Sequence, residues 1–289
     1  MGASIYLGKV LSSGTKGCNI ILPTAPSLLL DIYPNASVAY SLRKLRTAYT
    51  GNAIRVRRSS DNTEQDFGFV SNDLDTASLL TFCGAGNGFV TTWYDQSGNA
   101  YNTTQSTAAN QPQIVLSGAM LTTNGKNSIK FDGTNDFLAT TGTPFSATEN
   151  TLIAVSKQDA TSAYRRLFNI GNFAAGRYLG SANGTDDMLA IFNNSTFSCS
   201  GGVAITQNVS IMYNAGTNGV LRNNGSQVNT VTASNGSYLS KNLFIGNDEQ
   251  SNVGYFWNGI GQEFIFYPSN QATNVTGIES NINTFYTIY

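Results

Sequence analysis

The 289-residue sequence contains no histidine, and this absence excludes several kinds of chemistry. Without an imidazole there is no Ser-His-Asp or Cys-His nucleophile, no histidine-ligated zinc site and no ordinary proton shuttle at neutral pH. Any catalysis by this chain therefore depends on carboxylates.

Charge is also scarce. Charged residues make up 11% of the chain, against roughly 25% in typical soluble domains. The 16 basic and 17 acidic residues leave a formal net charge of -1. This balance argues against binding that neutralises nucleic-acid phosphates and against a polybasic membrane anchor. We expect neither a nucleic acid nor membrane insertion.

Cysteine is rare, and its positions suit no known framework. Cys18, Cys83 and Cys199 are odd in number and far apart, which fits neither a set of disulfides nor a Cys-x-x-Cys metal site. We expect free, mostly buried thiols, no bound metal and no cofactor. The start of the chain lacks a basic segment followed by an apolar one, and no run approaches the ~18 apolar residues of a membrane span. This predicts synthesis in a bacterial cytoplasm without a standard export signal.

The sequence is rich in turn residues that separate short apolar runs. Glycine occurs 29 times, and Asn, Ser and Thr gather between the runs. Regular short strands joined by Gly and Asn turns are typical of an antiparallel sandwich. The pattern predicts a mainly β fold with a few short helices, and two turns near residues 217 and 224 predict a hairpin. Strands are expected after residue 110 at 128–133, 136–141, 151–157, 165–171, 177–182, 187–193, 209–216, 219–225, 242–247 and 261–269.

Three segments have helical spacing. In 37–51 the apolar residues recur at helical intervals, and Gly51 is a suitable stop. In 75–84 an Asp75 or Thr76 cap precedes a short helix that ends at Gly84. A third helix is expected near the C-terminus, behind a cap at Asn270. The periodic positions of the first and last helices are Val38, Leu42, Leu45 and Tyr49, and Val275, Ile278, Ile282 and Phe285.

Residues 1 to about 30 differ in composition from the rest of the chain. Pro23 and Pro26 interrupt this stretch, and proline fixes φ and removes a backbone donor. We predict an N-terminal attachment arm. The domain is then 31–289, with a helix-containing N-terminal subdomain over about 31–110.

Several ordered motifs together resemble known families. The motif FDGTNDFLA at 131–139, followed by IGND at 245–248 and a final apolar strand and helix, resembles concanavalin A-like (laminin-G-like) lectin and glucanase sandwiches, which are jelly rolls. The stretches 39–69, 81–105 and 111–115 resemble the catalytic domain of α-L-arabinofuranosidase B and a group of bacteriophage virion proteins with the same opening. The two resemblances cover about residues 36 to 289.

The arabinofuranosidase resemblance assigns roles to particular positions. Such hydrolysis needs two carboxylates, and the nucleophilic glutamate of the family corresponds to Leu189 here. The family's acid/base aspartate corresponds to Asp248, and its Cys-Cys pair corresponds to Arg166 and Leu167. A leucine forms no glycosyl ester, so the resemblance implies a degenerate site with no catalytic residues and a protein that is not an enzyme.

A changed mechanism is the alternative. Asp186 and Asp187 precede Leu189 by three and two residues, or about 10 and 7 Å along a strand that rises ~3.3 Å per residue. Retaining hydrolysis needs carboxyl groups about 5 to 5.5 Å apart, whereas inverting hydrolysis accepts about 6.5 to 9.5 Å.

Two aromatic clusters are candidate glycan-binding sites. In the first, a strand end combines aromatic rings with polar groups that suit sugar hydroxyls: Trp93, Tyr94, Asp95, Gln96 and Asn99. The second comprises Tyr255 and Trp257 beside Asp248. The structural alternative for the first cluster is that Trp93 and Tyr94 are one core and one rim aromatic and that Asp95 makes a turn with Ser97. For the second cluster it is that the rings belong to the core.

Two further groups have structural interpretations. The basic residues Arg55, Arg57 and Arg58 are expected on a solvated sheet surface, paired with nearby acidic residues at 61, 64 and 66. Asp132, Asn135 and Asp136 offer three oxygen ligands, which is too few to assert a calcium site.

The resemblance to virion proteins sets the expected function. It predicts a bacteriophage structural protein, a head or tail fibre or decoration on the virion surface, whose lectin-like sandwich binds a host or environmental glycan without catalysis. Its partners would be other virion proteins, contacted through the arm, and copies of itself, with a trimer favoured by analogy with fibres. The alternatives are a glycoside hydrolase acting on arabinofuranosyl polysaccharides and a purely structural capsid or tail protein.

Overall fold

The computed structural model describes most of the chain after residue 27. The described residues are 28–140, 142, 149–160, 164–170, 177–181, 187–192, 195–198, 204–215, 217–232, 242–247 and 255–289, with the backbone alone for 191–192, 195–198 and 215.

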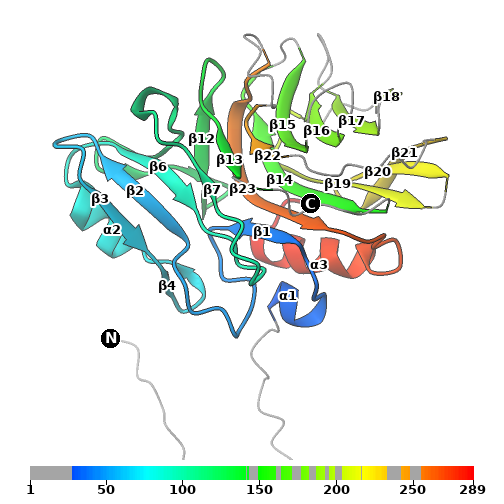
Figure 1. Ribbon diagram of the computed structural model, residues 1–289, viewed down its shortest axis with the longest axis horizontal. Helices are drawn as coiled ribbons and strands as arrows, with labels where there is room; N and C mark the ends of the chain where they lie inside the picture. Colours follow the sequence, from blue (N-terminus) through cyan, green and yellow to red (C-terminus); the bar gives the residue numbers. More distant parts are fainter. Residues whose placement is uncertain are drawn as a thin grey trace, which may run out of the picture.

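The fold is an antiparallel β-sandwich, as the sequence predicted (Figure 1). The first layer runs β21–β20–β19–β14–β23, and the far side of β23 pairs with β1 and β12. From β12 it continues through β8, β6, β2 and β3. Its strands are β1 Val38–Ser41, β2 Ile54–Arg58, β3 Glu64–Phe67, β6 Gly88–Trp93, β8 Gln113–Leu116, β9 Ala119–Met120, β12 Ile129–Asp132, β14 Thr151–Gln158, β19 Asn208–Ala215, β20 Asn218–Asn223, β21 Ser226–Thr232 and β23 Asn258–Tyr267.

The second layer runs β7–β13–β22–β15–β16–β17–β18 and joins the first where β7 pairs with β6. Its strands are β7 Thr103–Thr104, β13 Leu138–Thr140, β22 Leu243–Ile245, β15 Arg165–Ile170, β16 Arg177–Ser181, β17 Met188–Phe192 and β18 Ser195–Ser198. The remaining elements are α1 Leu29–Ile32, α2 Thr76–Cys83, α3 Val275–Tyr286, the 3₁₀ turn η1 Ala108–Asn110, and two small hairpins, β4 Phe69–Val70 with β5 Asp73–Leu74 and β10 Thr122–Thr123 with β11 Lys126–Asn127.

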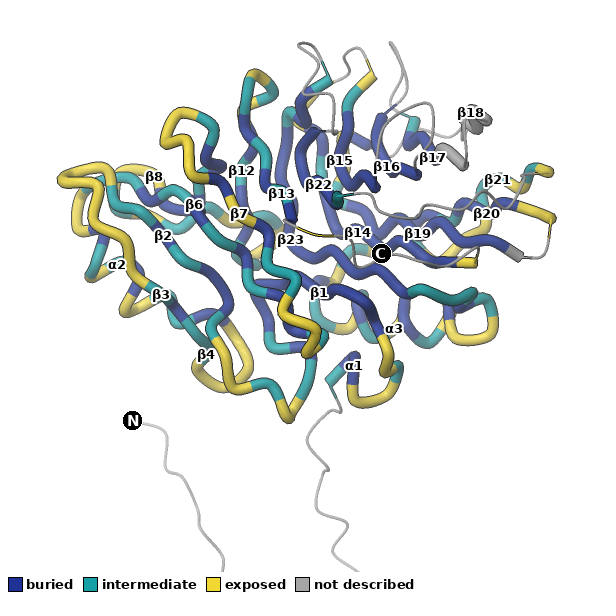
Figure 2. The backbone as a smooth tube through the Cα atoms, in the orientation of Figure 1, coloured by how far each residue is buried: buried dark blue, intermediate teal, exposed yellow. Residues whose placement is uncertain are grey.

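Strand β14 shows why the first layer has two hydrophobic faces. Leu152 and Ala154 point into the core between the two sheets, whereas Ile153 and Val155 point into a second core against α1 and α3. Side chains alternate across a strand, so a strand buried on both faces reads as a continuous apolar run. Figure 2 shows the buried backbone along the central strands and exposed residues at the turns. The order of layers is therefore helix, first sheet, second sheet.

The predicted helices have different outcomes. Helix α2 is confirmed: Asp75 accepts a hydrogen bond from Ser78 N at 3.1 Å, and Gly84 ends the helix. Helix α3 is also present, but it begins after Asn274. The predicted cap, Asn270, instead accepts a bond from Ala272 N in a local turn.

The predicted helix over 37–51 is wrong. Val38–Ser41 form β1, which pairs with β23 in register from Val38 opposite Phe266 to Ser41 opposite Glu263. Val38 lies in the core between the sheets and Ala39 lies in the helix-side core, so the segment is buried on both faces. Strand pairing with β23 overrides the helical spacing of the apolar residues.

The predicted hairpin is confirmed in β19, β20 and β21. Strand β19 pairs with β20, and β20 pairs with β21. The second turn places Asn224 and Gly225 at φ values of 47° and 78°, which only a few residue types adopt without strain.

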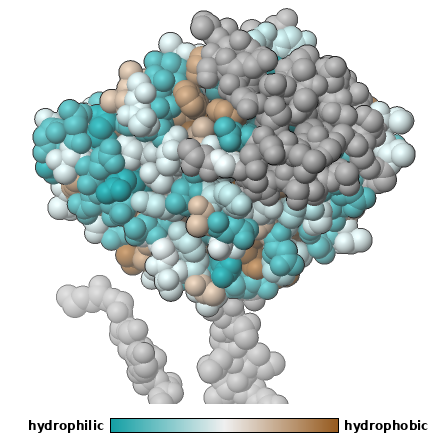
Figure 3. All heavy atoms as spheres, viewed as in Figure 1, coloured by the Kyte–Doolittle hydropathy of each residue, from teal (hydrophilic) through white to brown (hydrophobic). Residues whose placement is uncertain are grey.

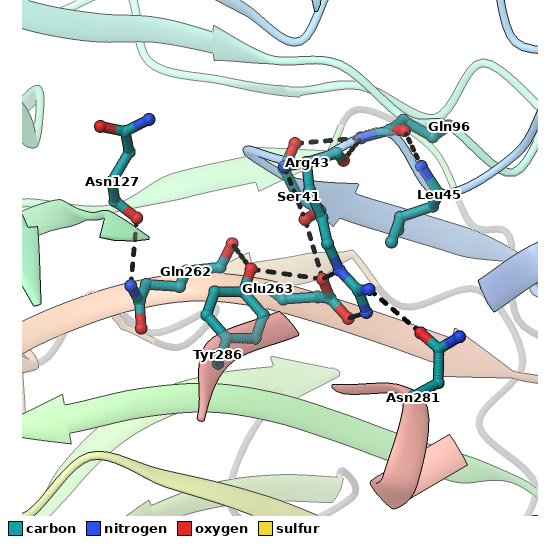
Figure 4. A network of polar contacts seen from close by, with 9 residues as sticks. All are labelled: Ser41, Arg43, Leu45, Gln96, Asn127, Gln262, Glu263, Asn281 and Tyr286. Carbon is teal, nitrogen blue, oxygen red and sulfur yellow. Dashed lines mark hydrogen bonds and ion pairs between the residues drawn. The ribbon is translucent and has the colours of Figure 1, made fainter. Parts of the chain in front are cut away.

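A buried ion pair connects β1, β23 and α3 (Figure 4). Arg43 binds Glu263 through two nitrogens, at 2.7 and 2.9 Å, and also donates to Asn281 of α3 at 3.0 Å. Ser41 and Tyr286 donate to the same carboxylate, so this buried charge has several partners. Such a pair is costly to break because either partner alone is an uncompensated buried charge.

Residues at the start of the described chain are part of the core. Leu29 and Leu30 are buried beside α3, so the folded domain includes α1. Residues 1–27 of the predicted arm lie outside the described residues, as do Cys18 and Cys199. Cys83 is a buried free thiol. In the part of the chain described here, no helix is both long and apolar enough to cross a membrane.

Candidate functional site

The outer face of the second sheet carries the position that the arabinofuranosidase resemblance assigns to the nucleophile. On this sheet Asn169 lies opposite Tyr178 and Phe244, and Gly180 lies opposite Leu189. Their neighbours along the strands, such as Phe168 and Leu179, point into the core between the sheets. Alternation therefore sends Asn169, Tyr178 and Leu189 to the outer face.

Leu189 is fully buried on this face and packs against Tyr178. Its apolar side chain supplies no nucleophile. Asp187 immediately precedes β17 and is half-buried. Because it is two residues from Leu189, strand alternation favours the same side, about 7 Å along the chain. Asp186 lies outside the described residues.

An arginine occupies the position of the family's cysteine pair. The Arg166 guanidinium carbon lies 4.0 Å from the ring centroid of Tyr178 and 4.9 Å from that of Tyr255. The next residue, Leu167, points into the core between the sheets. Cation–π contacts of this kind stabilise a buried guanidinium by about 0.5 to 2 kcal/mol each. On this face the Arg166 guanidinium thus contacts two tyrosine rings.

The turn after β22 lies next to β15. Gly246 donates to Leu167 O at 2.8 Å and accepts from Trp257 N at 2.9 Å. Its φ is +93°, and a Cβ there would lie 2.7 Å from Phe131. Asn247 follows and is fully buried, and its side-chain oxygen and nitrogen have no hydrogen-bond partner among the described residues. Asp248, the predicted acid/base position, lies outside the described residues.

A second carboxyl group adjoins this turn. The backbone oxygen of Asp136 would be 2.9 Å from a Cβ on Gly246. Its carboxylate accepts from Asp132 N at 2.9 Å, while Asp132 accepts from Thr134 N at 2.8 Å. Burial and then the charge of Asp132 raise the pKa of Asp136 to about 7. Backbone amides thus donate to oxygens of both aspartates of the FDGTND loop. Within the described ranges, no group of three His, Cys, Asp or Glu side chains is placed to hold a metal.

The first predicted glycan-binding cluster is mostly a structural element. Trp93 is fully buried against Tyr40 and Phe264. It is not accessible to a sugar, contrary to the predicted stacking role, because β6 turns this side chain into the core between the sheets.

Asp95 and Gln96 connect the chain after β6 to the segment around β1. Asp95 accepts bonds from Ala39 N, Tyr101 N and both the amide and hydroxyl of Ser97. Burial raises the pKa of Asp95, and these bonds oppose the rise. Gln96 binds Leu45 N and the carbonyls of residues 41 and 43. The polar groups thus hold backbone in place of sugar hydroxyls.

The other members of this cluster are nearer the surface. Tyr94 donates to Asp66 at 2.7 Å, and burial together with that bond raises its pKa to about 12. Asn99 is exposed and donates to the carbonyls of Ala36 and Ser37. Neither residue lies on the second sheet.

The second aromatic cluster is divided between core and surface. Trp257 is fully buried and donates to Ile260 O at 3.3 Å, so it does not face a ligand. Tyr255 is half-buried and is the ring that lies over Arg166. Sequence reasoning missed Arg166 and Tyr178 as a pair, although charged and aromatic residues in predicted strands were a usable signal.

Two of the three basic residues of β2 have the predicted acidic partners, whereas Arg57 donates to Gln111 and Asn62. Arg55 lies 3.3 Å from Glu64 and 3.6 Å from Asp66, and Arg58 lies 2.7 Å from Asp61.

The comparisons with known proteins agree with the arabinofuranosidase resemblance seen in the sequence. The sequence model of the family described as alpha-L-arabinofuranosidase B, catalytic, matches residues 31–158. A solved GH54 α-L-arabinofuranosidase soaked with a cyclic sulfate inhibitor is 16% identical, with a TM-score of 0.67 over 86% of this chain. An arabinofuranosidase complexed with arabinofuranosyl-α-1,2-xylobiose is 17% identical, with a TM-score of 0.65 over 86% of this chain. This chain covers 62% of each of those proteins. No curated protein sequence matches.

These findings correct one prediction. The expectation that the protein is not an enzyme is overturned, because a catalytic-domain model matches the N-terminal half and solved arabinofuranosidases have the same fold. The sandwich predicted from the sequence is confirmed, and the similarity indicates a β-sandwich related to glycans.

Proposed function

We propose that this chain is a glycoside hydrolase that acts on arabinofuranosyl polysaccharides. The observation that carries the proposal is the match of residues 31–158 to the arabinofuranosidase catalytic family. The shared fold supports it, since the likeness to an arabinofuranosidase extends over 86% of this chain.

The residues favour inverting hydrolysis. Leu189 removes the nucleophile that a retaining mechanism needs, whereas Asp187 lies two residues away, on the side of the strand expected from alternation. We assign Asp187 as the base that takes a proton from the attacking water, and Asp248 as the acid that protonates the leaving oxygen. Inverting enzymes separate these groups by about 6.5 to 9.5 Å so that a water fits between them.

Hydrolysis of 4-nitrophenyl α-L-arabinofuranoside and of arabinan by the purified chain tests the proposal. We expect Asp187→Asn and Asp248→Asn each to lower turnover about 100-fold or more, because general acid and base groups contribute that much. Asp61→Asn, on the turn between β2 and β3, is the control and should keep full turnover. Proton NMR of the first product should show inverted configuration. A wild-type chain with no turnover, or two variants with wild-type turnover, would refute the proposal.

The setting on a bacteriophage virion stays a proposal that rests on the resemblance to virion proteins. We propose that residues 1 to about 30 attach the domain to other virion proteins and that copies assemble as a trimer. Deletion of residues 1–27 should leave a cooperatively folding domain that no longer joins its partner. Threefold density in assembled particles would support the trimer, and a single isolated copy would contradict it.

A further inference from the structure

A groove of about 660 Å³ lies on the helix side of the first sheet, away from Leu189. Its walls come from α1, from α3 and from the turn between β4 and β5, three segments far apart in the sequence. Figure 1 shows α1 and α3 on one side of the molecule and β15, β16 and β17 on the other. The groove is therefore separate from the site proposed above, and its size is typical of a small-molecule site.

The wall formed by the β4–β5 turn has a backbone conformation that costs energy. Ser71 and Asn72 form the tip of the β4–β5 turn with φ values of 51° and 71°. Consecutive left-handed residues without a glycine are strained, and strain of this kind gathers at ligand sites.

The third wall contains a glycine inside a helix. A Cβ on Gly277 would lie 1.9 Å from the hydroxyl of Tyr33. Gly277 lies in the first turn of α3, and the absence of a side chain there allows the Tyr33 phenol to lie on the helix. Tyr33 also accepts a bond from Tyr267 through its carbonyl at 2.8 Å. The ring of Tyr33 is thus a fixed aromatic wall.

Charges along the groove balance one another. Arg43 is neutralised by the buried Glu263 and is directed toward Asn281 (Figure 4). Lys44 and Asp73 also line the groove, and neither has an ion-pair partner within 4 Å among the described residues. Apart from Arg43, the lining therefore contains one cation and one anion. A groove without net charge favours a neutral ligand, since a charged ligand would lose hydration without compensation.

Leu28 and Ile32 of the α1 wall are apolar, and most of the other lining residues present hydroxyl and amide groups. Ser71 and Asn72 provide them on one wall, and Ser280, Asn281 and Thr284 provide them along α3. Phe285 closes one end, held by Arg43 and Lys126 at 4.9 and 3.9 Å from its ring. On the face seen in Figure 3, hydrophilic and weakly polar residues surround small hydrophobic areas in the coloured part of the view.

We propose that this groove is a second glycan-binding site, which takes a neutral oligosaccharide. Tyr33 would lie against one sugar ring, and the amides and hydroxyls of the two walls would bind its hydroxyl groups. Such a site would bind one part of a polysaccharide on the helix side while another part of the same polysaccharide reaches the second sheet. Two weak sites joined in one domain bind a polymer more tightly than either alone.

Isothermal titration with linear α-1,5-arabinohexaose tests this site. The full chain carries Asp248→Asn throughout, so that the bond-cleaving site proposed above does not consume the ligand. Ser280→Trp fills the groove from an exposed position of α3, and Thr273→Trp, exposed and outside the groove, is the matched control. Lys44→Ala removes a groove donor without added bulk.

We expect Ser280→Trp to remove one binding site per chain and Lys44→Ala to weaken that site about tenfold, while Thr273→Trp leaves it unchanged. The stoichiometry falls from two to one if the second-sheet site also binds, and from one to zero if it does not, so the two proposals fail independently. Unchanged stoichiometry in Ser280→Trp would overturn the inference, and so would a wild-type groove that binds no neutral oligosaccharide. If Ser280→Trp changed the sedimentation of the protein and not its sugar binding, the groove would be a contact with a second copy of the chain. That result would also overturn the inference.

Discussion

Replacing Asp136 by asparagine should make the protein more stable at pH 8 but not at pH 4. Asp136 is almost fully buried in the FDGTND loop beside Gly246. Burial, followed by the charge of Asp132, raises its pKa to about 7, while its bond from Asp132 N and the charge of Lys130 oppose that rise. The ordinary pKa of an aspartate is about 3.9.

The sign follows from proton binding. Between pH 3.9 and pH 7 the folded chain holds a proton on Asp136 that the unfolded chain has lost, so the free energy of unfolding falls as pH rises across this window. Each pH unit lowers the free energy of unfolding by about 1.4 kcal/mol, and the total is about 4 kcal/mol over roughly three units. Water that reaches the carboxyl reduces this figure, and we expect about 2 to 4 kcal/mol. Asparagine is neutral throughout, and its oxygen still accepts from Asp132 N.

Urea unfolding of both proteins from pH 4 to pH 8 measures the difference. Other titrating groups are common to both chains and cancel in the comparison. The gain from Asp136→Asn should be near zero at pH 4 and should level off above pH 7. Glu149→Gln, at an exposed carboxylate, is the control. A difference that stays constant across this range would refute the reasoning.

Three further substitutions test packing and buried charge. Glu263→Gln should lower the free energy of unfolding by about 3 to 5 kcal/mol because Arg43 would remain buried without its partner, whereas Glu64→Gln, in a surface pair, should cost about 1 kcal/mol or less in the same denaturation assay. Gly246→Ala should lower the melting temperature much more than Gly125→Ala. Both glycines have positive φ, but of the two only Gly246 has a neighbouring side chain, that of Phe131, where the new Cβ would lie. Equal effects would contradict this packing. Asp75→Ala should lower the denaturant midpoint at pH 7. Its hydrogen bonds with Ser78 lower the pKa of Asp75. The stability that these bonds contribute is therefore lost as the pH falls through that lowered pKa. The difference in denaturant midpoint between variant and wild type should become smaller in acid.

The local elements with self-contained signals could be predicted from the sequence. Helix α2 carries its own cap at Asp75 and its own stop at Gly84. The turn at Asn224 and Gly225 determines how β20 and β21 pair. These signals act over a few residues, so they do not depend on the rest of the fold.

The segment 37–51 shows where such reasoning failed. Its helical spacing was real, but Val38–Ser41 pair with a strand more than 200 residues later. Pairing with β23 and burial on both faces outweigh a weak helical preference, and only the tertiary structure brings those partners together. The burial of Trp93 and Trp257 likewise depends on the tertiary structure, and it could not be predicted from their position in a polar motif.

The candidate site divides in the same way. From the sequence alone, the resemblance placed a leucine at the nucleophile position and one aspartate at the acid/base position. Only the paired strands put Arg166 between Tyr178 and Tyr255 on the face of Leu189. Only the packing of α1, α3 and the β4–β5 turn forms the groove around Tyr33. Both sites combine residues from distant segments, and the contacts that join them exist only once the two cores have formed.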